Sequence, residues 1–250
     1  MIRIRKGLSC LAILLLVVAS LVATVQLTSD AQAVGLDESM LWASADVRAE
    51  ICPGLNDNAL RQISDSGLAR IRKHLGEGTG YSYDRAYRVY SLSNVDVINA
   101  FNEKGSLCQC ISPEFKWNVP LIAGKQTTGT ATLTLRDKTW CVSSFGDAPS
   151  GEVSLLGDLN KMEALLTDKG LSNITQIKAV YLPLYHITML YICSDGEEYA
   201  MAVNEARFTD IETYEIYTAK QFIDALEKAF GKPVPQDPKE PVIYGLPGSK

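Results

Sequence analysis

The sequence predicts an α+β fold, with antiparallel sheet and helices packed on one face. Two observations support this prediction. Alternating, β-rich runs follow one another along the chain without a helix between them, and an amphipathic helical segment closes each series of runs. Strands in series that are closed by a helix favour α+β over a parallel α/β arrangement.

The first series of strands lies between residues 119 and 145. Thr130–Arg136 reads TATLTLR, in which threonines alternate with alanine and leucine. Asp137-Lys138 is expected to turn the chain into a strand over Thr139–Phe145, and Val119–Ala123 is a third candidate strand. A helix is expected over Leu155–Lys169, where leucine and methionine recur at helical spacing.

The second series repeats this order. Thr175–Leu182 and Tyr185–Cys193 are apolar runs, and Asp195-Gly196 is a strong hairpin signal before a strand over Glu198–Val203. A helix is expected over Thr218–Phe230, which begins with the Thr-x-x-Gln pattern of a capping box. The two series are compatible with two successive βββα blocks along the chain.

A helical part is expected to precede the strands, over residues 36–76. Its clearest segment is Asn56–Leu75, where apolar residues follow the rhythm of an amphipathic helix. His74 lies at the edge of that apolar stripe and is interpreted as a partly exposed helix residue.

The N-terminus has the features of an export signal. Three basic residues precede an uncharged run from Leu8 to Val25, and Ala31-Gln32-Ala33 matches the small-x-small pattern that signal peptidase accepts. The sequence therefore predicts a signal peptide over residues 1–33, with an uncleaved anchor through residues 8–25 as the alternative. Both place residues 34–231 outside the cytoplasm as one α+β domain, secreted or anchored, followed by a proline-rich tail over 232–250.

Charge argues against two classes of partner. The chain has a formal net charge of −5, and no basic cluster follows the leader. Nucleic acid and anionic membrane surfaces are bound through such clusters, so neither is an expected partner.

Five cysteines follow the leader, so at most two disulfides form and one sulfur is left over. If Leu107–Ile111 is extended, Cys108 and Cys110 share a face with Cα atoms roughly 6.6 Å apart, and a bond between them is strained. We expect one or both to bridge to another cysteine; inert buried thiols and a redox or metal role remain as alternatives. The disulfide candidates are Cys52, Cys108, Cys110, Cys141 and Cys193.

No catalytic motif, metal-binding spacing or cofactor-binding loop occurs in the sequence. His186 and Cys193 lie on one predicted strand about 23 Å apart, so they cannot form a dyad. His186 beside a cysteine of a neighbouring strand is the arrangement that a thiol-dependent enzyme would need.

Aromatic residues supply the binding-site candidates, which are Tyr81, Tyr83, Trp117 and Trp140. Their alternative role is that of half-buried strand residues. The sequence therefore predicts a non-catalytic exported module that binds an extracellular protein or glycan through a strand edge or an aromatic patch. A thiol-dependent enzyme with His186 as base is the alternative, together with an inhibitor or pro-segment-like partner of a secreted hydrolase.

Overall fold

The computed structural model describes most of the predicted domain. Several predictions lie outside the described residues: the signal peptide, the helix over Asn56–Leu75 and the tail over 232–250. Cys52, His74 and Tyr81 also lie outside them, and Tyr83 is described only in its backbone. The described residues are 35–51, 82–83, 86–123, 126–146, 150–206 and 209–231.

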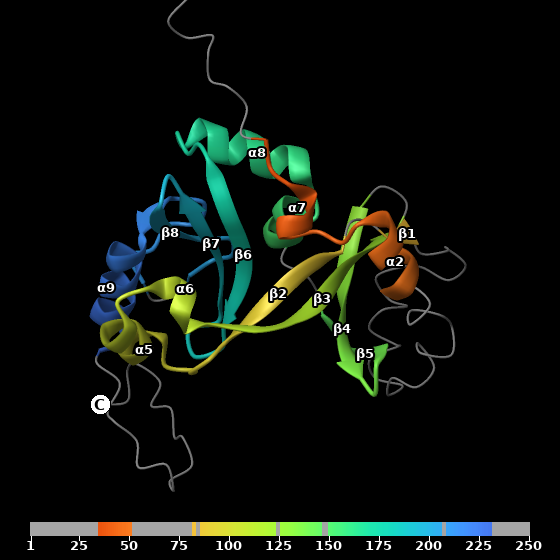
Figure 1. Ribbon diagram of the computed structural model, residues 1–250, viewed down its shortest axis with the longest axis horizontal. Coiled ribbons are helices and arrows are strands. Elements are labelled where there is room, and N and C mark those ends of the chain that lie inside the picture. The colour runs from red at the N-terminus through yellow and green to blue at the C-terminus, as the bar shows by residue number, and fades with distance from the viewer. Residues whose placement is uncertain are drawn as a thin grey trace, which may run out of the picture.

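All described strands belong to one sheet, in the order β5-β4-β3-β2-β6-β7-β8-β9, with β1 paired to β3 (Figure 1). The pairing of strands is antiparallel throughout except between β2 and β6, which run parallel. The predicted α+β class is therefore confirmed. The strands are β1 Ser82–Tyr83, β2 Tyr87–Leu92, β3 Ile111–Ala123, β4 Gln126–Arg136, β5 Thr139–Gly146, β6 Ile174–Leu182, β7 Ile187–Ser194, β8 Glu197–Ala202 and β9 Tyr217–Thr218.

Helices cover both faces of the sheet, so the prediction of one helical face is wrong. Along β6, Val180 and Leu182 pack into a core with α5 and α9, whereas Ile177 and Ala179 pack into a second core with α7 and α8. Figure 1 shows these two groups of helices on opposite sides of β6. The helical elements are η1 Glu38–Met40, α2 Ala45–Ile51, α5 Val97–Lys104, α6 Leu107–Cys110, α7 Ser150–Leu156, α8 Leu159–Asp168 and α9 Ala219–Phe230.

A third core lies under α2, at the other end of the sheet. Ile51 of α2 packs there against Trp117 and Val119 of β3 and Leu133 of β4. Of the predicted helical part over residues 36–76, the described residues contain η1 and α2. No helix among the described residues is both long enough and apolar enough to cross a bilayer.

Both predicted tight turns are present. Asp137 and Lys138 join β4 to β5 with φ of 47° and 64°, and Asp195 and Gly196 join β7 to β8 with φ of 52° and 85°. Two successive positive φ values match the twist of the flanking strands, and this is why such residues are favoured in two-residue hairpins.

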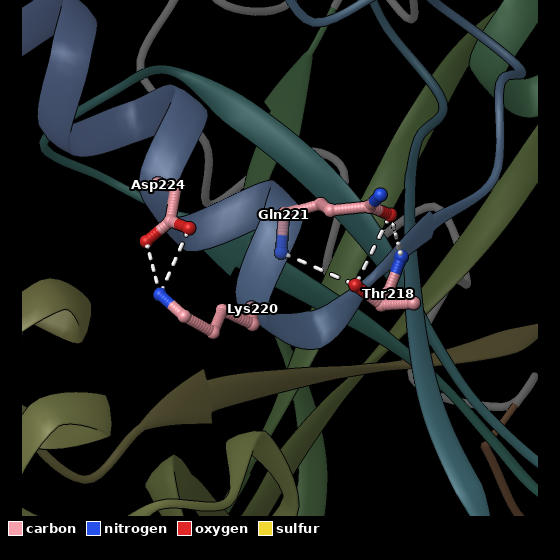
Figure 2. Close-up of polar contacts among 4 residues, drawn as sticks. All are labelled: Thr218, Lys220, Gln221 and Asp224. Carbon is pink, nitrogen blue, oxygen red and sulfur yellow. Dashed lines mark hydrogen bonds and ion pairs between the residues drawn. The ribbon is translucent and has the colours of Figure 1, made fainter.

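The capping box of α9 is also confirmed (Figure 2). The Thr218 hydroxyl accepts the amide of Gln221 at 3.3 Å, and the Gln221 side chain accepts the amide of Thr218 at 3.0 Å. Lys220 and Asp224 form an ion pair at 2.9 Å on the exposed side of the same helix.

The helix predicted over Leu155–Lys169 is divided into α7 and α8. The helix is interrupted at Asp158, because the carboxylate of Asp158 accepts the amide of Lys161 at 3.2 Å and caps the start of α8. Two successive βββα blocks are not confirmed: the strands of both series lie in one sheet, joined by β2.

Candidate functional site

Aromatic rings and two cations form a continuous row across several strands of the sheet, which we call the aromatic row. The guanidinium carbon of Arg88 lies 5.2 Å from the ring centre of Phe115 and 5.1 Å from that of Trp117. The ring centre of Tyr90 lies 5.7 Å from that of Phe115, and Nζ of Lys178 lies 5.6 Å from Tyr90. The members of the row are Trp140, Phe115, Trp117, Arg88, Tyr90 and Lys178.

Strand register explains the row. Arg88 lies opposite Trp117, and Tyr90 lies opposite Phe115, in the antiparallel pair of β2 with β3. Residues two apart on a strand share a face, so these four side chains stack on one side of the sheet.

Two of the predicted aromatic candidates meet in this row. The ring centres of Trp117 and Trp140 lie 6.4 Å apart in an edge-on arrangement, and Trp140 is also 6.1 Å from Phe115. Trp117 is only 2% exposed, so it supports the row from the core, whereas Trp140 and Phe115 are half-buried. The row therefore presents rings with accessible surface beside β5.

Strand β5 ends the sheet on this side. Among the described residues it pairs only with β4, through its register from Thr139 to Gly146. Its sequence, TWCVSSFG, contains no charged residue and no proline. Natural sheets commonly protect an edge with those residues or with a bulge, and β5 has only the bulge, at Ser143.

Cys108 and Cys110 lie on a one-turn helix, α6, so the extended conformation considered for Leu107–Ile111 is wrong. Ser106 starts this helix because its hydroxyl accepts the amide of Gln109 at 3.4 Å. Residues two apart on a helix do not face each other, and the two thiols therefore have different surroundings.

Cys110 is fully buried, and its Sγ donates to the carbonyl of Ser106 at 3.3 Å. Burial raises the pKa of the Cys110 thiol, with a smaller lowering from Lys104. Cys110 therefore has the surroundings of a buried core thiol, which are typical of unreactive cysteines.

Cys108 is half-exposed and contacts polar groups of β6. Its Sγ lies 3.8 Å from Nζ of Lys178 and donates to Oε1 of Gln176 at 3.5 Å. We call Cys108, Lys178 and Gln176 the thiol cluster. Lys178 belongs to both the thiol cluster and the aromatic row, so the two features adjoin.

Glu198 of β8 fixes the position of α6. Its carboxylate accepts the hydroxyl of Ser106 at 2.8 Å and the amides of Leu107 at 2.7 Å and Cys108 at 3.1 Å. The hydroxyl of Tyr191 donates to the same carboxylate at 3.2 Å. Burial, followed by a hydrogen bond with Cys108 and the charge of Glu198, raises the pKa of Tyr191.

The four described cysteines, Cys108, Cys110, Cys141 and Cys193, are free thiols. Cys141 lies on β5, five strand spacings from Cys193 on β7, which corresponds to roughly 24 Å. This separation argues against a bridge between those two cysteines in this fold. A disulfide that includes Cys52 remains a prediction.

His186 does not lie beside any of the four cysteines that the structure describes. It is exposed in the turn between β6 and β7, with φ of 54°, and its Nδ1 is 3.4 Å from the hydroxyl of Tyr181. Lys178 is four residues before the end of β6, roughly 13 Å along the strand. Lys178, which sequence reasoning missed, is therefore the basic group at Cys108.

Glu152 is an acidic side chain that the sequence patterns did not single out. Burial on α7 raises the pKa of Glu152, opposed by a hydrogen bond with Thr188. Burial and then the charge of Glu152 raise the pKa of Tyr87 and of Tyr214. The carboxyl group therefore lies among two tyrosines and a threonine from separate parts of the chain.

Replacing Glu152 with glutamine is expected to stabilise the protein at neutral pH, because it removes the free-energy cost of ionising a buried carboxyl group. Each kcal/mol gained in this way raises the unfolding temperature by about 2–4 °C. Because the pKa of Glu152 in the folded protein lies above its ordinary value of 4.5, the stability of the wild type falls as pH rises from 4.5 through the folded-state pKa. The glutamine variant lacks this decline. Thermal unfolding of both proteins from pH 4 to pH 8 measures the difference, and parallel curves would contradict the assignment.

The described residues contain no group of three or more His, Cys, Asp or Glu side chains that could hold a metal ion. No family model, curated protein or solved structure matches this chain.

Proposed function

We propose that this chain is an exported, non-catalytic binding module that adds an extended segment of an extracellular protein to the edge of β5. The observation that carries the proposal is an eight-residue edge strand without charge or proline, which contains the half-buried Trp140. Main-chain groups of such an edge supply affinity to an added strand, and neighbouring side chains supply selectivity. The signal peptide that the sequence predicts over residues 1–33 supports the exported location.

The aromatic row supports binding rather than catalysis. Half-buried rings such as Phe115 and Trp140 provide a large contact area at low conformational cost. Arg88 and Lys178 in the row are cations, and Arg136 and Lys138 are exposed at the β4–β5 turn. These charges favour a partner segment that carries acidic side chains, although the chain as a whole is acidic.

Selection of displayed random peptides against the full chain tests this function without a known partner. We expect enriched peptides to alternate apolar and acidic residues, because alternate side chains of an added strand face the same side. Binding is then compared with an edge-blocked variant, Thr139→Lys with Ser144→Lys, whose two positions are exposed on β5. We expect this variant to lose at least about tenfold in affinity, or about 1.4 kcal/mol.

A matched control places the same two charges on α8, through Asn160→Lys with Ala164→Lys at exposed positions. The control separates blocking of the edge from a change in net charge and is expected to bind as the wild type does. Equal binding of the selected peptides by the edge-blocked variant, or enrichment of peptides without a two-residue period, would contradict the proposal.

A further inference from the structure

We propose that Cys108 is a thiol–disulfide exchange site for low-molecular-weight disulfides, with Lys178 as the residue that positions and stabilises the reacting sulfur. This inference concerns the thiol cluster on α6 and β6, and β6 is four positions from β5 in the order of the sheet. It shares Lys178 with the aromatic row but does not involve the edge of β5.

The surroundings of Cys108 differ from those of the other described cysteines. Cys110, two residues away, is fully buried and held by the Ser106 carbonyl. Cys108 is half-exposed, and the Lys178 ammonium donates to its sulfur at 3.8 Å. Exposure combined with a neighbouring cation is the environment of reactive cysteines, whereas buried apolar thiols are inert.

The position of the Lys178 ammonium is itself fixed. Its Nζ lies 5.6 Å from the ring centre of Tyr90 and 5.9 Å from that of Tyr191, so two aromatic faces hold it beside Cys108. Gln176 completes the cluster, because its side-chain oxygen accepts from the thiol at 3.5 Å. When the thiol ionises, the Lys178 contact becomes a charge-assisted hydrogen bond.

The carboxylate of Glu198 is hydrogen-bonded to groups other than Lys178. Its oxygens accept from Ser106, from two amides of α6 and from Tyr191. Those contacts anchor the backbone of Cys108 over β6. The fixed position of α6 therefore holds the Cys108 sulfur next to the Lys178 ammonium on β6. This arrangement favours attack by the Cys108 sulfur on a disulfide that approaches from one direction.

The exchange step needs no external oxidant other than the disulfide itself. The Cys108 thiolate attacks one sulfur of oxidised glutathione, forming a Cys108–glutathione disulfide and breaking the original sulfur–sulfur bond. The displaced glutathione thiolate takes up one proton from solvent, which balances the proton that Cys108 lost. One disulfide is consumed and one is formed.

To test the proposal, the full chain is exposed briefly to oxidised glutathione. Peptide mapping by mass spectrometry then measures the modification of each cysteine separately. We expect Cys108 to be modified about tenfold faster than Cys141, which is similarly half-exposed and serves as the control within the same molecule. Lys178→Met should slow modification of Cys108 by about the same factor without affecting Cys141, and Lys178→Arg should restore most of the rate.

Rescue by the conservative variant separates electrostatic support from a purely structural role, because only Lys178→Arg keeps the positive charge beside the sulfur. Equal rates at Cys108 and Cys141, or a Cys108 rate in Lys178→Met equal to that of the wild type, would overturn the proposal. Unchanged thermal unfolding of the variants checks that altered rates do not come from altered folding.

Discussion

Replacing Glu198 with alanine is expected to lower the free energy of unfolding by about 2–4 kcal/mol. The carboxylate accepts from the Ser106 hydroxyl, from two amides at the start of α6 and from the Tyr191 hydroxyl. Alanine leaves these donors without their acceptor, and Tyr191 is almost completely buried. Hydrogen bonds to a charged group contribute more than neutral ones, so the expected loss is large for a single partly exposed residue.

The neighbouring residue provides the control. Glu197 belongs to the same hairpin and is exposed, so Glu197→Ala is expected to change stability by no more than about 0.5 kcal/mol. Urea unfolding of both variants measures the difference. If Glu198→Ala proves as stable as Glu197→Ala, the carboxylate does not anchor α6 as described.

Replacing Trp42 with alanine is expected to lower the free energy of unfolding by about 3–5 kcal/mol. Trp42 is 1% exposed, and its indole N–H donates to the carbonyl of Leu156 at 2.6 Å. The main chain of Trp42 also forms an isolated β-bridge with Tyr87 at the start of β2. The side chain lies in the core that α7 and α8 share with the sheet, so its removal leaves a cavity there.

A second variant separates packing from hydrogen bonding at this position. Trp42→Phe keeps most of the apolar volume but leaves the Leu156 carbonyl without its donor, so a loss of about 1–2 kcal/mol is expected. Denaturant midpoints of the two variants should differ clearly. A Trp42→Ala variant that loses less than Trp42→Phe would contradict this account of the core.

Local patterns predicted β4 to β8 and both hairpin turns, because those features depend on nearby residues, whereas β2 was not predicted. The alternation of Thr130–Arg136 and the residues Asp137-Lys138 specify a hairpin without help from the rest of the chain. The capping box at Thr218 is equally local. Each of these signals acts within a few residues, and each is confirmed.

Features that depend on distant contacts could not be predicted in this way. The buried run of β7 is apolar on both faces, which is typical of a strand covered by helices on two sides, but periodicity alone does not reveal that covering. The conformation of Cys108 depends on Glu198, 90 residues later, whose carboxylate accepts its amide. Lys178 reaches the same sulfur from a third part of the chain, and no spacing in the sequence predicts that contact.

The parallel pair of β2 with β6 has a consequence for how the protein assembles. Val89 faces Ala179 and Tyr90 faces Val180, so this seam connects positions about 90 residues apart, whereas the β4–β5 and β7–β8 hairpins close within a few residues. Chain entropy therefore favours early formation of the hairpins on either side and late closure of the seam. The sheet is continuous once folded, but its two halves are the natural units in which it forms and opens.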